Sequence, residues 1–531
     1  MSKAKITLEK FSTLKYRMIF EGIIVGLITG FLVAIFRLAI EHAETLRRTL
    51  YSDENPRAMA VLFIVMLAGT LVVWAAAKLE PHSSGSGIPQ VKGELVGDIS
   101  QSWYRVISAK LAGATTAIGL GLSLGREGPS IQLGAMIGKG LSKVTKKLPI
   151  EEKMLITCGA GAGLAGAFCA PLAGVVFALE ELHKNFSTEI LLSTMSASVV
   201  SNFIASSIFG LEPVFKISIA ERLPLRLYWM IVILGVVLGI LGKVYNRFMM
   251  TALNLYDLIS SKLLRIVIAV ALAAVLGFVF PQALGSGHFL VEQIAYSGNT
   301  LGLGSETISF FSENTGHIIK IFLLLFVTKL FFSAVSFGSG APGGIFLPLL
   351  VLGAIAGGGF SVAVGKEFYI ANFVIIGMTG LFASIVRAPI TGVILITEMT
   401  GDFSNFLPLA VVALVSYVIA DITGASPIYD ELLERNVAKN LKGDEANHRF
   451  SKKVLVEGDV YFGSKMDGQT IADMELPAGS LVISVERGQR EIVPDGSTRL
   501  QGGDKIVLLC AEDYHSQIAE ILDSLCKRID R

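Results

Sequence analysis

The chain has 531 residues, of which 52% are hydrophobic and 17% are charged, and its formal net charge is +1. Together with a mean hydropathy of +0.63, this composition excludes a soluble protein of ordinary domains and predicts a polytopic membrane protein in a lipid bilayer. No nucleic-acid partner is expected, and the net charge near zero hides an asymmetric distribution of basic residues.

Two kinds of membrane segment are predicted along the chain. Full spans need about 20 apolar residues to cross a hydrocarbon core of about 30 Å. We expect them at residues 18–41, 59–79, 187–209, 227–243, 264–281, 318–336 and 406–420. Other apolar stretches contain glycine and proline, and we expect broken, partial or re-entrant helices at residues 103–123, 131–138, 154–179, 343–364 and 371–397. Such helices persist in a bilayer only where protein or water satisfies their backbone.

The basic residues predict an orientation. Lysine and arginine precede the first span, and four lysines lie at residues 139–147. By the positive-inside tendency, we expect both regions to be cytoplasmic. The first apolar run is too long for the core of a cleavable signal peptide, so none is expected. The four cysteines have neither metal nor disulfide spacing, and we expect no metal or other cofactor.

Two parts of the chain repeat one pattern. Gly125-Arg-Glu-Gly-Pro129 matches Gly344-Ile-Phe-Leu-Pro348 at an offset of 219 positions, and each is followed by a run of small residues. A second pair, Ala170–Glu180 and Ala388–Glu398, has nearly the same offset. Repeats with glycine- and proline-interrupted segments are typical of a midplane binding site built from half-helix ends. The spacing alone leaves open whether the repeats are parallel or inverted.

Three glycine-rich turns are candidates for anion binding: Gly85–Pro89, Gly125–Pro129 and Gly338–Pro348. The first N–H groups of a helix have no internal partner, and with the macrodipole they form a positive pole that favours a small anion. Glycine permits close approach of the backbone, and proline is tolerated in the first helical turn. The alternative is that these glycines only pack at helix crossings.

In this order and wording, the three turns resemble the signature motifs of the CLC family of chloride channels and proton/chloride exchangers, over about residues 16–440. The resemblance implies an all-α polytopic membrane protein with inverted repeats and with partial and re-entrant helices. It also implies a homodimer with one anion pathway in each subunit and with both termini cytoplasmic. The chloride-binding residues that it implies are Ser86, Gly125, Arg126, Ile345, Phe346 and Tyr429.

Within this set, the resemblance gives each group a role. Ser86 matches the serine whose hydroxyl coordinates the central anion, and Tyr429 matches the tyrosine whose hydroxyl closes the inner side. Ile345 and Phe346 match the residues that offer backbone N–H groups. Serine at position 86 is typical of chloride-preferring members.

Glu127 matches the external gating glutamate, and its role also follows from its chemistry. A carboxylate at a helix N-terminus is itself an anion, so it would occupy the position that binds chloride. Protonation would neutralise and release it, which makes proton uptake and chloride access one exchange step. The alternative is a structural ion pair with its neighbour Arg126. Phe346 stands at the aligned position in the second copy.

By resemblance, Glu181 is the internal proton-transfer glutamate of many exchangers. Its presence favours exchange of chloride for protons over a passive chloride channel gated by Glu127. The alternative is a solvated glutamate at the membrane interface with no role.

Other polar or charged residues have structural or unassigned roles. Glu180 aligns with Glu398 in the duplication and is interpreted as structural, and Lys110 matches a buried lysine near the pathway. Gln90 and Lys92 stand where well-known exchangers carry acidic residues, so the pairing of charges there is left open.

Two enzyme-like patterns are explained better by membrane helices. Gly121–Gly125 fits G-x-S-x-G without an obvious strand before it. Gly161–Gly166 fits G-x-G-x-x-G, but the segment that should be its crossover helix contains Pro171 and recurs at 388–398. We therefore expect a transporter and no enzyme.

The chain changes character near residue 440. We expect a transport domain over residues 1–440, a polar linker over 441–454 and a cytosolic domain over 455–531. Alternating apolar residues and turn signals predict strands and then a helix, at residues 479–486, 490–493, 505–510 and 513–526.

The run Leu476–Asp504 resembles the TrkA-C (RCK C-terminal) regulatory domain. This resemblance implies a small α/β module of βαβ type that pairs with its twin and binds a regulatory, nucleotide-like ligand. A dimerising domain without a ligand is the alternative. The tail also suggests a potassium-transport component, but the chain lacks a Thr-Val-Gly-Tyr-Gly filter. A TrkA-C-like tail points to a prokaryotic protein, and hence to the cell inner membrane or plasma membrane.

Overall fold

The computed structural model of the protein describes residues 3–526 except 53–54, 185, 218, 220, 297–299, 304–305, 310–314, 441–452, 475, 477–479, 489 and 512–514. The chain forms two compact units, Met1–Leu433 and Glu434–Arg531. Most of the linker predicted over 441–454 therefore lies outside the described residues. Helix α17 (Ile428–Asn440) begins in the first unit and ends in the second.

Among its described residues, the first unit is helical apart from a short pair of antiparallel strands. Its first half contains α1 (Lys3–Ser52), α2 (Pro56–Leu79), η1 (Pro81–Ser83), α3 (Ile88–Val96), α4 (Trp103–Gly119), α5 (Glu127–Val144), α6 (Pro149–Phe168), α7 (Pro171–Phe177), η2 (Ala178–His183) and α8 (Thr188–Phe209). Its second half contains η3 (Leu225–Leu227), α9 (Tyr228–Asp257), α10 (Lys262–Val279), η4 (Pro281–Ala283), α11 (His288–Tyr296), β1 (Thr300–Leu303), β2 (Glu306–Ser309), α12 (Thr315–Gly338), α13 (Phe346–Ala363), η5 (Glu367–Tyr369), α14 (Ile370–Val386), α15 (Pro389–Thr400), η6 (Phe403–Asn405) and α16 (Phe406–Ile422).

The membrane class predicted from composition is confirmed. In the described part of the chain, nine helical segments are long and apolar enough to cross a membrane. Each of the seven predicted spans corresponds to one of them, in α1, α2, α8, α9, α10, α12 and α16. Five lie wholly within these segments, whereas 187–209 begins one residue before α8 and 264–281 ends two residues after α10. The other two segments contain α13 and α14.

Two of the glycine- and proline-rich stretches contain a break between helices. At each break, a residue with left-handed backbone conformation is followed two positions later by proline. α6 ends before Cys169, which has φ 53°, and α7 begins at Pro171. In the same way, α14 ends before Arg387, with φ 69°, and α15 begins at Pro389. Within 343–364, α13 runs without interruption, and its proline lies in the first turn, where no N–H is required.

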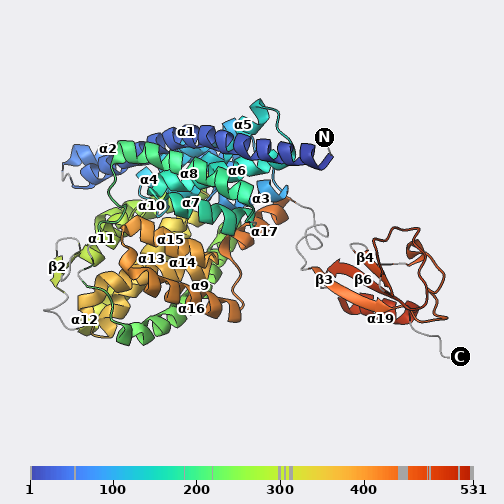
Figure 1. The fold of residues 1–531 in the computed structure, drawn as a ribbon. Helices are drawn as coiled ribbons and strands as arrows, with labels where there is room; N and C mark the ends of the chain where they lie inside the picture. The colour runs from blue at the N-terminus through green and yellow to red at the C-terminus, as the bar shows by residue number, and fades with distance from the viewer. Residues whose placement is uncertain are drawn as a thin grey trace. The chain divides into compact units, whose positions relative to one another are not determined.

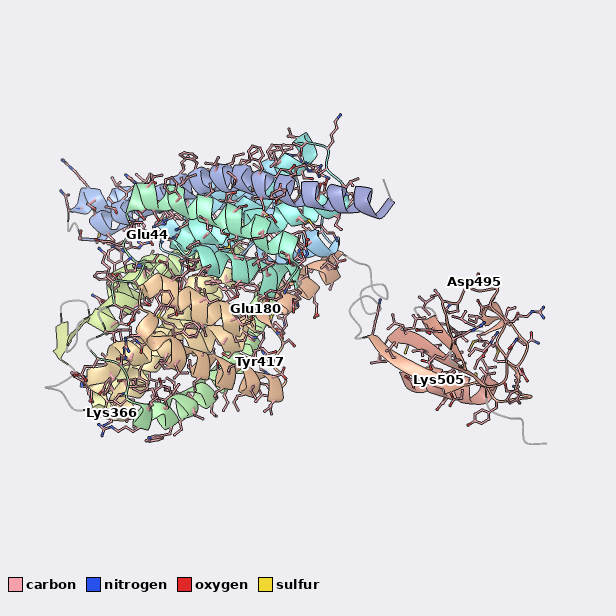
Figure 2. All side chains as sticks on the ribbon, in the orientation of Figure 1. Glu44, Glu180, Lys366, Tyr417, Asp495 and Lys505 are labelled. Carbon is pink, nitrogen blue, oxygen red and sulfur yellow. The ribbon has the colours of Figure 1, made fainter. Side chains whose placement is uncertain are left out.

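Two aligned glutamates show that the repeats are inverted. Glu180, just after α7, accepts hydrogen bonds at the start of α15, including one of 2.8 Å from the Thr391 N–H. Glu398, near the end of α15, accepts one of 2.8 Å from the Ala173 N–H at the start of α7. Because each carboxylate caps the start of the other helix, α7 and α15 run antiparallel. Figure 2 labels Glu180 where the two halves meet.

The two halves also pack in the same way. Figure 1 shows α1, α6 and α8 together on one side of the unit and α13, α14 and α16 on the other. In the first half, Gly134 of α5 lies against Gly159 of α6, and in the second half Gly353 of α13 lies against Gly377 of α14. A Cβ atom at any of the four would collide with the facing backbone, so the small-residue runs permit close helix contact.

In its described residues, the second unit contains the end of α17, a four-stranded sheet and a helix that follows the last strand. Its strands are β3 (Lys453–Asp459), β4 (Leu481–Arg487), β5 (Arg490–Ile492) and β6 (Asp504–Ala511), in the order β3-β6-β4-β5, and η7 (Ile471–Asp473) precedes β4. α19 (His515–Cys526) packs against β3 and β6. The three predicted strands and the helix are present, whereas β3 was not predicted. Every pairing in this sheet is antiparallel, so the expected βαβ crossover is wrong.

Candidate functional site

The three glycine-rich turns meet at one place, although they come from distant parts of the chain. The Gly125 N–H donates to the Gly344 carbonyl at 2.6 Å, and the Gly344 N–H donates back to the Gly125 carbonyl at 2.8 Å. The Gly85 N–H donates to the Ala341 carbonyl at 3.3 Å, and the Gly343 N–H donates to the Gly85 carbonyl at 3.0 Å. Backbone hydrogen bonds between these turns therefore join the two halves at this junction.

Three helices begin at this junction. α3 starts at Ile88, α5 at Glu127 and α13 at Phe346. Because the first N–H groups of each helix lack intrahelical partners, three positive poles gather there. Glycine is required for this approach: a Cβ atom at Gly128 would lie 2.5 Å from the Ser86 hydroxyl. The packing and anion-site interpretations of the glycines are thus compatible.

Two hydroxyl groups in this region are buried. Ser86 is 1% exposed and Tyr429 is 0% exposed. Neither hydroxyl has a hydrogen-bond partner among the described residues. A buried hydroxyl left unpaired costs about 1–3 kcal/mol, so both are suited to donate to a small anion. Tyr429 also lies close enough to Glu127 and Glu181 for electrostatic interaction.

Glu127 is fully buried and is the first residue of α5. Its carboxyl group interacts with the backbone N–H groups of Arg126, Glu127 and Leu347, although neither oxygen makes a hydrogen bond of normal geometry. A Cβ atom at Gly125 would collide with a carboxyl oxygen, so the side chain lies back over the junction. The ion pair of Arg126 is with Glu41, at 3.8 Å. This geometry does not support a structural pair between Glu127 and Arg126.

Phe346, at the aligned position of the second copy, is held by other aromatic rings. Its ring centroid lies 5.7 Å from that of Phe168, 6.1 Å from Phe177 and 4.9 Å from Phe382. The side chain is apolar and fully buried, so it cannot compete with an anion for the positive pole at the start of α13. The two copies thus differ by one ionisable group at equivalent positions.

Glu181 is only 4% exposed, so it is not a solvated residue at the membrane interface. Lys92 of α3 donates to its carboxylate at 2.8 Å. Lys92 also contacts a carboxylate oxygen of Asp430, the residue after Tyr429 in α17. The other oxygen of Asp430 accepts from Lys184 at 3.2 Å. The charge pairing that the sequence left open is therefore a cluster of two cations and two anions.

Two buried lysines hold equivalent turns in the two halves. Lys110 donates to the carbonyls of Ser83 and Gly85 at 2.8 and 2.7 Å. Lys329 donates to the carbonyls of Ala283 and Gly285 at 3.0 and 2.8 Å. The turn 285–287 is thus a second copy of 85–87. The sequence comparison missed it, because the two turns are 200 residues apart whereas the other motifs are 218 or 219 apart.

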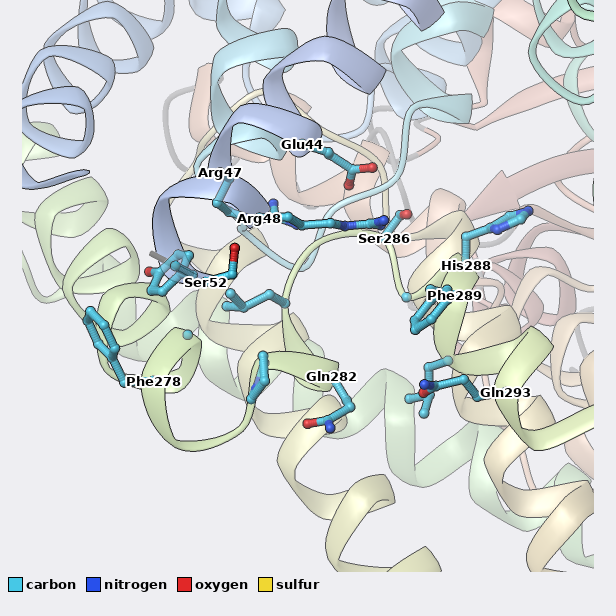
Figure 3. A pocket seen from close by; sticks show the side chains of 16 residues that line it. Glu44, Arg47, Arg48, Ser52, Phe278, Gln282, Ser286, His288, Phe289 and Gln293 are labelled. Carbon is cyan, nitrogen blue, oxygen red and sulfur yellow. The ribbon is translucent and has the colours of Figure 1, made fainter. Parts of the chain in front are cut away.

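The second turn borders two cavities. One, of about 540 Å³, is lined by Arg48, Ser286 and His288 among others, and Figure 3 shows these side chains around it. The other, of about 380 Å³, shares those three residues and also reaches Arg126 and Leu347. Arg126 and Leu347 both interact with the Glu127 carboxyl. The second cavity therefore extends from the turn 285–287 towards the junction.

The apolar spans, the inverted repeats and the junction of three helix N-termini together define a multi-pass membrane protein built from two related halves. Residues 68–421 match the family described as voltage gated chloride channel, and residues 455–523 match the TrkA-C domain. The chain belongs to the voltage gated chloride channel family and carries a TrkA-C domain.

Curated relatives agree with this assignment. The chain is 30% identical over 438 residues to the H(+)/Cl(-) exchange transporter ClcA of Salmonella schwarzengrund (strain CVM19633), which covers 79% of this chain and 89% of that protein. It is 30% identical over 439 residues to the protein of the same name from Vibrio campbellii (strain ATCC BAA-1116), covering 80% and 90%.

Solved structures share the fold. A slow cyanobacterial Cl−/H+ antiporter superposes with a TM-score of 0.71 at 33% identity, covering 80% of this chain and 98% of that chain. A CLC-type fluoride/proton antiporter superposes with a TM-score of 0.63 at 21% identity, covering 81% and 99%. At that lower identity the second likeness shows the fold alone. The fold class predicted from the sequence is thereby confirmed.

Proposed function

We propose that the protein exchanges chloride for protons across the cell membrane, with Glu127 as the protonatable gate. The names of the relatives and of the cyanobacterial structure, an exchange transporter and an antiporter, support this function. The observation that carries the proposal is the place of the Glu127 carboxyl, which lies over a junction of three helix N-termini, in a region with two buried hydroxyls.

The proposed chloride ligands surround this junction. The hydroxyls of Ser86 and Tyr429 and the backbone N–H groups of Ile345 and Phe346 would donate to the anion, and the backbone at Gly125 and Arg126 would add to the positive field.

In the ionised state, the Glu127 carboxylate takes the place of chloride. A proton neutralises it, so chloride then binds without repulsion and the protonated side chain can leave the junction. Glu181 would exchange this proton with the opposite side of the membrane. One proton-binding event thus controls access for the anion, which is the requirement for coupled exchange.

The setting in the cell is part of the same proposal. The bacterial relatives support an inner membrane or plasma membrane, and the basic N-terminal segment supports cytoplasmic termini. We propose that two copies form a homodimer, and that the TrkA-C domain binds a regulatory, nucleotide-like ligand.

Transport in liposomes tests the function. An outward chloride gradient should drive protons inward against their own gradient when the purified protein is reconstituted. The alternative, a passive chloride channel gated by Glu127, would move chloride without protons, and nothing in the geometry favours it over exchange. Chloride flux that leaves the pH of the vesicle lumen unchanged would overturn the proposal.

A further inference from the structure

Lys92 stands at the centre of a buried charge cluster. Its ammonium group is shared between Glu181 and Asp430, and the side chains of Lys92 and Glu181 are each 5% exposed. Water therefore screens this pair weakly. Asp430 has a second cation, Lys184, whereas Lys92 is the one cation hydrogen-bonded to Glu181 in the described part of the chain.

The cluster connects three elements of the candidate site. α3, which carries Lys92, follows the turn of Ser86, and η2 carries Glu181. α17 carries Tyr429 directly before Asp430. Lys92 divides its bonds between the two carboxylates. A change in this division would therefore affect both Glu181 and the helix that positions the Tyr429 hydroxyl.

Other ionisable groups near Glu181 are directed elsewhere. Its neighbour Glu180 caps α15, and His183 makes a 3.0 Å hydrogen bond with Thr157 of α6, the helix whose Lys153 also acts on His183.

The charged groups that act on Glu181 are thus Lys92, Asp430 and Lys184, with the Tyr429 hydroxyl nearby. Lys92 lies on α3, Asp430 and Tyr429 lie on α17, and Lys184 directly follows η2. This leaves Lys92 as the group that most directly sets the charge of Glu181.

We propose that Lys92 is a positioning residue for proton transfer, which orients Glu181, offsets part of the cost of burying its charge and links its protonation to the helix of Tyr429. This role rests on the proposed function, because it takes Glu181 as the proton-transfer group. Burial favours the protonated carboxyl, and the bonded cation opposes this effect, so Glu181 takes up its proton at a lower pH than it would without Lys92. Once Glu181 is neutral, Lys92 is bound to Asp430 alone.

Two substitutions should shift the proton flux in opposite directions. Lys92→Gln removes the cation, so the pH midpoint of chloride-driven proton flux should rise by about one to three pH units. Asp430→Asn removes the competing carboxylate, so Lys92 pairs with Glu181 alone and the pH midpoint of proton flux should fall. Lys92→Arg keeps the charge and should stay near the wild type. Damage to packing alone would not give shifts of opposite sign.

Lys139→Gln is the matched control. Lys139 forms a buried pair with Glu94 of the same helix α3, at 2.5 Å and with side chains 5% and 7% exposed, but it has no bond to Glu181. This variant should lose thermal stability like Lys92→Gln and keep the wild-type midpoint.

Each outcome of this experiment decides the proposal. An unshifted midpoint in Lys92→Gln, or an equal shift in Lys139→Gln, would overturn the role of Lys92 while leaving exchange intact. If Lys92→Gln does not fold, a midpoint in Asp430→Asn that is unchanged or higher overturns the role. A wild-type protein that carries chloride without protons would overturn the proposed function and this role with it.

Discussion

Replacing Glu127 with glutamine tests the competition between carboxylate and chloride. The amide has the same shape as the carboxyl group but no charge and no titrating proton. Two unit charges about 5 Å apart repel by about 3 kcal/mol at an effective dielectric constant of about 20. That energy corresponds to roughly a hundredfold change in an equilibrium constant. We therefore expect Glu127→Gln to conduct chloride, to carry no coupled protons, and to bind chloride up to about a hundredfold more tightly than the wild type at a pH high enough to ionise the wild-type carboxylate fully.

The pH dependence gives the sign of this effect. In the wild type, the carboxylate competes with chloride when it is ionised, so chloride affinity should rise as the pH falls and Glu127 becomes protonated. In Glu127→Gln the affinity should not change with pH. Calorimetric titration of the purified protein measures binding, and a chloride electrode with an internal pH dye measures both fluxes in liposomes.

Glu41→Gln is the control for this experiment. Glu41 also lies near Arg126, at 3.8 Å, but its side chain is 46% exposed and it is not at the junction. This variant should keep both coupling and the pH dependence of binding. Coupled proton flux that persists in Glu127→Gln, or chloride affinity that remains pH-dependent there, would refute the reasoning.

The remaining predictions concern packing and stability. Gly128→Ala places a Cβ atom 2.5 Å from the Ser86 hydroxyl, so chloride affinity should fall at least about tenfold in the same calorimetric titration, and unchanged affinity would contradict the site. Glu398→Ala removes the cap of α7 and should cost about 1–2 kcal/mol, seen as a lower melting temperature in detergent, with the ratio of chloride to protons unchanged. In the second unit, burial alone would raise the pKa of Asp504, but hydrogen bonds from Arg487 and the Gln501 N–H lower it overall. Its stabilisation should therefore be present above about pH 4 and be lost as the pH falls further, which hydrogen exchange in β6 would detect, and Asp504→Asn should remove this dependence.

The membrane spans could be predicted from the sequence, because a run of apolar residues of sufficient length has few other stable environments. The junction could be predicted in part. Its turns are continuous motifs, and the duplication points to them through residue identity alone. The pairing of the turns is set by backbone hydrogen bonds between Gly125 and Gly344, which a sequence does not display.

The charge cluster could not be predicted, because its members lie far apart in the chain. Lys92 and Asp430 are 338 residues apart. In the sequence, Lys92 is visible only as a departure from the family pattern, and nothing marks Asp430. The second turn, 285–287, was hidden by a shift in the repeat offset, and its equivalence rests on Lys329 and Lys110 binding matching carbonyls.

The reversal potential of the wild-type protein tests the central claim most directly. With purified protein in a planar bilayer or in liposomes, chloride and proton gradients are varied separately while the voltage of zero current is measured. Coupled exchange predicts a reversal potential that moves with the proton gradient at constant chloride. A reversal potential that follows the chloride gradient alone, whatever the pH on either side, would contradict the account.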